Sequence, residues 1–121
     1  TGIGETLKSQ YPDIEIWAVE PEHAAILAGG TIGTHLQMGI GDGIIPDILN
    51  REIYDDIYIV TDEEALQTAK DLAVKEGIMC GISSGTNVAA ALKLAEKLGV
   101  HITTCPDDGY EILERVIGNI K

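Results

Sequence analysis

Apolar side chains recur at helical spacing in two long segments of the chain. Residues 61–77 open on the sequence TDEE, where the Thr61 hydroxyl can accept a hydrogen bond from a first-turn amide while Glu64 reaches back, which is a capping box. Residues 83–98 repeat the spacing with many alanines, which allow close packing against a sheet. We therefore predict a helix over each segment, the first of them ended by Gly77. The apolar positions that define the two helices are Ala65, Leu66, Ala69, Leu72, Ala73, Val88, Ala91, Leu92, Ala95 and Leu98.

Shorter elements surround these two helices. Runs rich in branched and aromatic residues predict strands, and short apolar segments that end at proline or glycine predict brief helices. The expected strands are 14–19, 57–60 and 100–104, with a short buried strand or bend at 78–82, and the brief helices are 1–10, 22–28 and 110–117. Because strands alternate with helices at short intervals, we expect a single three-layer α/β domain with a mainly parallel sheet over residues 1–121.

Composition narrows the classes of function. The 20 acidic residues outnumber the 8 basic ones and give a net charge of −12, which disfavours nucleic acid as a partner. No apolar run approaches the ~20 residues that span a bilayer, and no basic-then-apolar signal segment stands at the start. The chain begins at a threonine, so we expect a longer parent protein. Cys80 and Cys105 lie in apolar stretches and are expected to be buried and inert, as suits the cytoplasm, and the scattered histidines predict no metal site.

Ligands of parallel sheets bind in loops at the carboxyl ends of strands, here residues 39–46, 81–85 and 105–109. In the first loop, glycines at alternate positions would let the backbone approach a flat ligand, although an ordinary surface loop would look the same. In the second, GISSG places Ser83 and Ser84 at a helix start, where N-capping and anion binding are both open. In the third, CPDDG could complement a helix dipole or aim a carboxylate at a ligand nitrogen.

Taken in order, these motifs resemble the second half of the cysteine synthases (O-acetylserine sulfhydrylases) and of their relatives, the cystathionine β-synthases. The resemblance rests on AVEP, GG, GIGDGIIP, the capped helix, KEGIMCGISSGTNVAAALKLA and PDDG. It runs from Thr1 to about residue 98 and becomes loose beyond that point. It implies the fold type II architecture of pyridoxal-phosphate enzymes, in which two α/β domains enclose a cofactor cleft.

The resemblance also implies what each motif does. In the family, the lysine that binds the cofactor and the loop that holds its phosphate lie in the N-terminal half, so this chain is expected to carry no catalytic residue and to be inactive alone. None of its lysines stands in the family's lysine motif. The positions that match the cofactor site are Gly39, Ile40, Gly41, Gly43, Ser83, Ser84 and Asp108.

Asp108 departs from the family pattern, which has a serine beside the pyridine nitrogen at that position. A carboxylate there would favour a protonated pyridine ring, whereas a hydroxyl leaves the ring largely neutral. Three explanations stay open: retuned chemistry, an unused site, or a shift of register in this weakly matching end.

For the whole protein the resemblance implies β-replacement, in which sulfide replaces the acetoxy group of O-acetylserine to give cysteine and acetate. It also implies a cytoplasmic homodimer with pyridoxal phosphate and an amino-acid substrate. The missing N-terminal half would be the first partner. The alternatives are a cystathionine β-synthase fragment, or a non-catalytic domain that binds, for example, the C-terminal tail of a serine acetyltransferase.

Overall fold

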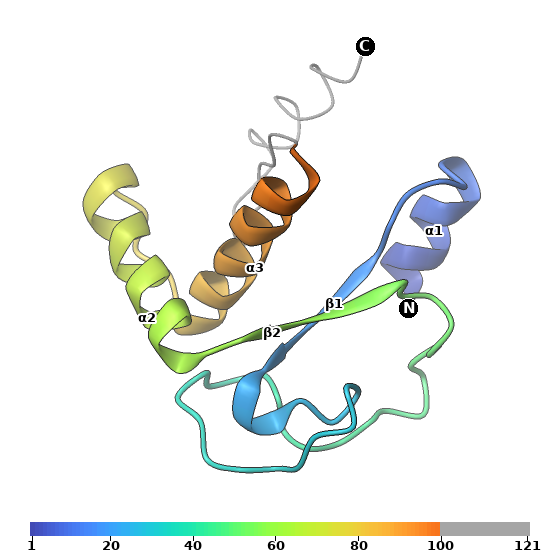
Figure 1. Cartoon of the computed structure of the whole chain (residues 1–121), viewed down its shortest axis with the longest axis horizontal. Helices are drawn as coiled ribbons and strands as arrows, with labels where there is room; N and C mark the ends of the chain where they lie inside the picture. Colours follow the sequence, from blue (N-terminus) through green and yellow to red (C-terminus); the bar gives the residue numbers. More distant parts are fainter. Residues whose placement is uncertain (100–121) are drawn as a thin grey trace.

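The computed structural model describes residues 1–99, and within them two parallel strands form the only sheet. Strand β1 (Trp17–Pro21) pairs with β2 (Asp56–Val60), with Trp17 opposite Asp56 and Pro21 opposite Val60. Both strands therefore end at the same edge of the sheet (Figure 1). The expected α/β class with a parallel sheet is confirmed.

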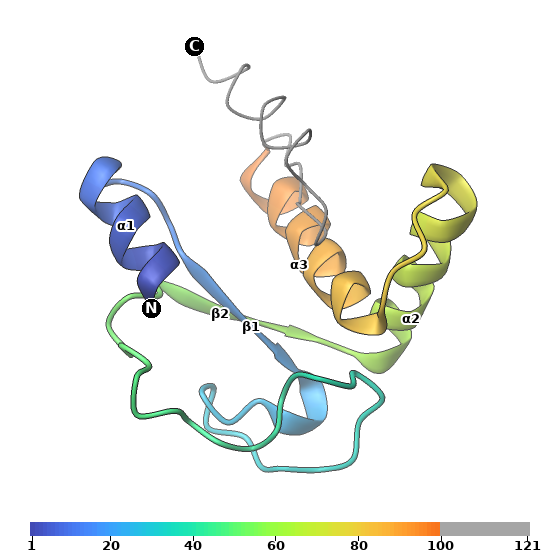
Figure 2. The same ribbon diagram turned by 180° about the vertical axis from the view of Figure 1, so that it is seen from behind.

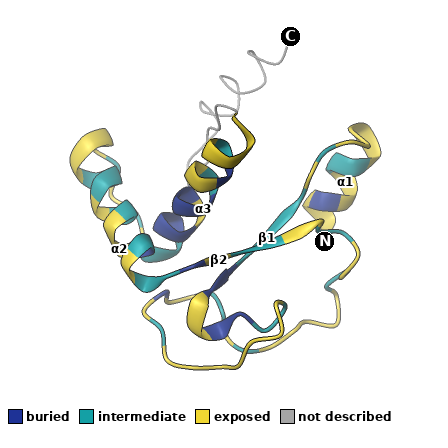
Figure 3. Cartoon of the chain, in the orientation of Figure 1, coloured by how far each residue is buried: buried dark blue, intermediate teal, exposed yellow. Residues whose placement is uncertain are grey.

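Helices α2 (Asp62–Asp71) and α3 (Ile82–Leu98) pack against each other beside the sheet (Figures 1 and 2). The two helices share the core cluster of Val60, Ala65, Ala89 and Ala90 with the end of β2, and the small side chains of the three alanines allow the helices to lie close together. Figure 3 shows the buried positions of α3 gathered near the sheet, while the outer turns of α2 are exposed. The helix predicted over residues 83–98 is confirmed, but its packing face is not the predicted one: Leu92 and Leu98 are 58% and 49% exposed, and the buried apolar positions are Val88, Ala89, Ala90 and Leu94.

The predicted capping box at the start of α2 is confirmed. The Thr61 hydroxyl accepts a hydrogen bond from the Glu64 amide at 3.2 Å, and the Glu64 carboxylate accepts one from the Thr61 amide at 3.0 Å. The helix continues as the π-helical turn η2 (Leu72–Glu76) and ends at Gly77, whose φ of +72° is the left-handed conformation that glycine adopts readily. Gly77 therefore ends the segment as the sequence predicts.

Two predicted elements are wrong. Of the two alternatives predicted for residues 78–82, a short buried strand or a bend, the buried strand is wrong: residues 78–81 connect η2 to α3, and Met79 is 89% exposed and Cys80 only half-buried. Residues 22–28 form only a 3₁₀ turn, η1 (Glu22–Ala24), because the Glu20 carboxylate takes the amides of Leu27 and Ala28 that a continuing helix would use.

Of the other predicted elements, one has a shifted boundary, one matches, and several lie outside the described residues. The first strand begins at Trp17 rather than at residue 14, and helix α1 (Gly2–Gln10) matches the helix predicted over residues 1–10. Five predictions lie outside the described residues: strand 100–104, loop 105–109, helix 110–117, Cys105 and Asp108. No helix within residues 1–99 is both long and apolar enough to cross a membrane.

Asp55 joins α1 to the sheet. Its carboxylate accepts hydrogen bonds from the Ile16 amide and from the Lys8 ammonium, both at 2.7 Å, and these two bonds, the amide first, lower the pKa of the Asp55 carboxyl. A lowered pKa in the folded state means that this contribution to stability is complete above about pH 4 and is lost as the pH falls through the lowered value.

We expect Lys8→Gln to move the pKa of Asp55 upward, towards its ordinary value, because one of the two donors then loses its charge. Titration of the carboxyl carbons by NMR measures this shift. Asp71, whose pKa is lowered by Lys75 and then by Gln67, serves as an internal control and should titrate unchanged. An unchanged Asp55 titration in Lys8→Gln would contradict the assignment.

Candidate functional site

The carboxyl edge of the sheet gathers the candidate site. Pro21 ends β1 and Val60 ends β2, and the first turn of α3 lies beside this edge. The long connection between the strands passes below the same edge (Figure 1). Two of the three predicted ligand loops, residues 39–46 and 81–85, lie on these segments.

The glycines of the first loop are required by its backbone. Gly39, Gly41 and Gly43 have φ values of +89°, +69° and +74°, the left-handed region that other residues rarely adopt. At Gly41 a Cβ would lie 2.8 Å from Pro21 Cγ and 3.1 Å from Ala24 Cβ, so the loop backbone rests directly on the end of β1. We call residues 39–43 the glycine loop.

A cavity of about 150 Å³ opens between the glycine loop and the end of β1. Gly41 and Gly43 line it together with Val19, Glu20 and Ile44. Glu20 is buried, but its carboxylate already accepts hydrogen bonds from the Leu27 and Ala28 amides at 2.9 and 3.1 Å. Glu20 therefore shapes this cavity and is not a free acid or base within it.

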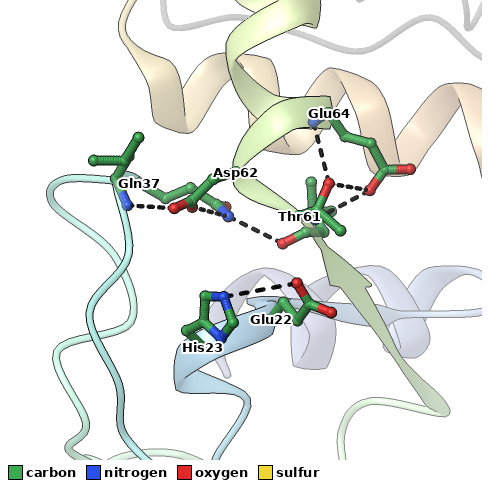
Figure 4. A network of polar contacts seen from close by, with 8 residues as sticks. Glu22, His23, Gln37, Thr61, Asp62 and Glu64 are labelled. Atoms are coloured by element: carbon green, nitrogen blue, oxygen red, sulfur yellow. Dashed lines mark hydrogen bonds and ion pairs between the residues drawn. The ribbon is translucent and has the colours of Figure 1, made fainter.

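A buried glutamine fastens the glycine loop to the rest of the site. Gln37 has no exposed surface, and its amide nitrogen donates to the carbonyl of Val60 at 3.0 Å and to the carboxylate of Asp62 at 3.1 Å (Figure 4). Its amide oxygen accepts from the hydroxyl of Thr86 at 2.8 Å. One side chain thus ties the loop to the end of β2, the start of α2 and the first turns of α3.

Asp62 reinforces this link from the start of α2. Its second carboxylate oxygen accepts a hydrogen bond from the Leu36 amide at 2.8 Å. The carboxylate also lies in the first turn of α2, where the positive end of the helix dipole favours a negative charge. The segment before the glycine loop is therefore held by both a side chain and a backbone contact.

The serines of GISSG do not cap α3. The N-cap is Gly81, without a side-chain hydrogen bond, so the capping interpretation of Ser83 and Ser84 is wrong. Ser84 is buried and Ser83 is half-buried, and the following Gly85 lies where α3 crosses α2. These serines belong to the wall between α3 and its neighbours.

The structure places the predicted residues unevenly. Gly41 and Gly43 line the cavity, whereas Gly39 and Ile40 are not among its lining residues, and Asp108 lies outside the described part. Sequence reasoning missed Glu20, Gln37, Asp62 and Thr86. A glutamine among the apolar and glycine residues of HLQMGIG was the one available sign of a buried polar link.

The described residues fit only one wall of a pyridoxal-phosphate site. Gly41 supplies a backbone surface without a side chain, which suits a flat ring, but no lysine or arginine lines this cavity to hold a phosphate. A larger cavity of about 370 Å³ lies between α2 and α3, lined by Glu63, Gln67, Ala89 and Leu92 among others. The glycine loop does not line this larger cavity. Residues 1–99 also contain no cluster of three or more His, Cys, Asp or Glu that could hold a metal ion.

Comparisons with known proteins agree with this arrangement. The family model described as "Pyridoxal-phosphate dependent enzyme" matches residues 1–104. A cysteine synthase from Staphylococcus aureus is 43% identical over 116 residues, which cover 93% of this chain and 37% of that protein. This chain therefore spans little more than a third of that relative's length.

Two solved structures share the fold. The crystal structure of O-acetylserine sulfhydrylase isoform 3 from Entamoeba histolytica superposes with a TM-score of 0.77 and 39% identity, over 81% of this chain and 29% of that one. The O-acetylserine dependent cystathionine β-synthase from Helicobacter pylori gives a TM-score of 0.74 and 38% identity, over 79% of this chain and 31% of that one. The expected fold type II architecture is confirmed. The chain belongs to the pyridoxal-phosphate dependent enzyme family, and within it is similar to the cysteine synthases.

Proposed function

We propose that this chain is part of a cysteine synthase, in which it forms one wall of the pyridoxal-phosphate site. The observation that carries the proposal is the approach of the Gly41 backbone to the end of β1, beside a cavity at the carboxyl edge of a parallel sheet. The similarity to cysteine synthases over most of the chain supports the choice of reaction. The reaction is replacement of the acetoxy group of O-acetylserine by sulfide, with release of acetate.

The cofactor, when bound, supplies the electron sink for β-replacement chemistry. This chain's own task is positioning. The glycine loop offers the cofactor a surface without side chains, Gln37 holds that loop against β2 and α3, and Ser83 and Ser84 support the wall beside it. The lysine that binds the cofactor and the phosphate loop come from the rest of the protein, so the chain alone is inactive.

We place the chain in the C-terminal half of the complete enzyme, as the order of its motifs suggests. The complete enzyme is proposed to be a cytoplasmic homodimer. Light scattering on the complete protein tests the dimer, and a monodisperse monomer would contradict it. A serine acetyltransferase tail is the further partner that the resemblance implies.

We expect Gly41→Ala in the complete protein to raise the dissociation constant of pyridoxal phosphate about tenfold or more. The added Cβ meets Pro21, Ala24 and His35 at 2.8–3.1 Å, which pushes the loop away from the strand end, and a tenfold change needs only about 1.4 kcal/mol. Titration followed by the visible absorbance of the lysine-bound cofactor measures it.

Gly77→Ala is the matched control, because Gly77 has nearly the same φ of +72° but no atom of the described residues lies within 4 Å of the added Cβ. Equal cofactor affinities in the two variants would contradict the proposal that the glycine loop forms a wall of the cofactor site. If the complete protein binds no pyridoxal phosphate at all, a non-catalytic binding domain becomes the better reading.

A cystathionine β-synthase is the second candidate, favoured by the 38% identity to the Helicobacter pylori structure. Assays of the complete protein with O-acetylserine separate the two. Faster turnover with sulfide supports the cysteine synthase, and faster turnover with homocysteine supports the alternative.

A further inference from the structure

The ring of His35 joins the two ends of the segment that leads into the glycine loop. The backbone amide of Gln37 donates a hydrogen bond to His35 Nδ1, with 3.2 Å between the two nitrogens. On the other side of the ring, His35 Nε2 lies 3.3 Å from the carbonyl oxygen of Gly41. The ring is half-buried. The ring therefore links the backbone at residue 37, just before the glycine loop, to the backbone at residue 41 within it.

These two contacts define which nitrogen carries the proton. Because Nδ1 accepts from an N–H group, it must be the unprotonated nitrogen, so the neutral ring carries its proton on Nε2. Nε2–H then donates to the Gly41 carbonyl. A Cβ on Gly41 would lie 3.0 Å from Nε2, so the same glycine that rests on β1 also rests on this ring.

Building on the proposed function, we propose that His35 is a positioning residue that closes the glycine loop in its neutral Nε2–H form and releases it when the ring is protonated. A protonated ring carries N–H groups on both nitrogens and cannot accept from the Gln37 amide. The closed loop holds the neutral ring, whereas the open loop accommodates either form. Closure is therefore favoured at high pH and weakened as the pH falls.

Charged and titratable groups lie on each element around the ring. The elements next to the ring carry Glu20 on β1, Glu22 and His23 on η1 and Asp42 within the glycine loop, and Asp62 bonds the amide of Leu36, the residue after His35. The carboxylates among them favour a charged ring, but the Glu20 and Asp62 carboxylates already accept bonds from backbone amides and are fixed in place. The backbone N–H of Gln37 points at Nδ1, so it opposes the addition of a proton to that nitrogen.

The effect is measurable on the loop without any cofactor. Because the loop closes only on the neutral ring, we expect its closed-to-open ratio to fall about tenfold between pH 7.5 and 5.5. Hydrogen exchange at the buried Gln37 amide reports this ratio, once the intrinsic pH dependence of exchange is removed. NMR couplings across the ring report the tautomer.

Two substitutions separate closure from mere packing. His35→Phe keeps a ring but neither hydrogen bond, and should speed exchange at Gln37 about fivefold at every pH. His35→Asn keeps an oxygen that can accept from the amide two residues on, as in an Asx turn, and should restore protection without any pH dependence. His23→Asn, at a histidine whose side chain is 58% exposed, is the control and should leave exchange at Gln37 unchanged.

The expected result is the Nε2–H tautomer, a tenfold loss of protection at low pH, and rescue by asparagine. An Nδ1–H tautomer, or equal protection in wild type and His35→Phe, overturns the proposal. Cofactor affinity of the complete protein is measured separately. If protection of Gln37 changes with pH as expected while the affinity for pyridoxal phosphate does not change, the proposed cofactor wall is contradicted and the closure of the loop by His35 is retained.

Discussion

Replacing Gly85 by alanine should destabilise the chain by about 3 kcal/mol, because the new Cβ would lie 2.1 Å from the carbonyl oxygen of Ala65. It would also lie 2.9 Å from the amide nitrogen of Ala69, and both atoms belong to the backbone of α2. Neither can move as a flexible side chain would, so α3 must shift away from α2. Denaturant unfolding followed by circular dichroism measures the loss.

Gly2→Ala is the matched control, since Gly2 begins α1 and no atom lies within 4 Å of its added Cβ. Alanine is favoured over glycine in a helix by up to about 1 kcal/mol, so this variant should be neutral or slightly more stable. If Gly85→Ala unfolded at the same denaturant concentration as wild type, the close crossing of α2 and α3 would be refuted.

The second large effect is expected at Gln37. Gln37→Leu fills a similar volume but removes the donor for the Val60 carbonyl and for Asp62, and the acceptor for Thr86. A buried polar group without a partner costs about 1–3 kcal/mol, and the Thr86 hydroxyl keeps a second bond to the Ile82 carbonyl. We therefore expect a loss of about 2–4 kcal/mol in the free energy of unfolding.

Gln67→Leu is the control for this experiment. Gln67 is an exposed glutamine on α2 whose side chain, within residues 1–99, bonds only Asp71 one turn further on, so its loss should change stability by less than about 0.5 kcal/mol. Equal effects at the two glutamines would show that the link between the glycine loop and β2 contributes little. A large effect at Gln37 with unchanged unfolding of Gln67→Leu would support it.

Local signals carried most of the fold prediction. The capping box at Thr61 and Glu64, the left-handed Gly77 and the presence of a helix at α3 all follow from residues within a few positions of one another. These features are set by propensity and periodicity, which a sequence displays directly. The glycines of the 39–43 loop were recognisable for the same reason.

The predictions that failed depended on contacts that the pattern of residues does not indicate. The run IMCGI looks like a strand, but the apolar pattern does not say whether another strand lies beside it. The helix expected over residues 22–28 is interrupted by the Glu20 carboxylate, whose burial the sequence does not indicate. Gln37 likewise gains its meaning only from Val60 and Thr86, which lie well beyond it along the chain.

The parallel pairing of β1 with β2 has a consequence for how the chain folds. Trp17 meets Asp56 only after the whole connection that contains the glycine loop has closed, whereas α2 and α3 are joined by the much shorter segment of residues 72–81. Local contacts form sooner than distant ones because less chain entropy is lost first. The helical pair is thus the expected early unit of folding, and the glycine loop takes its shape late, when the second strand aligns with the first.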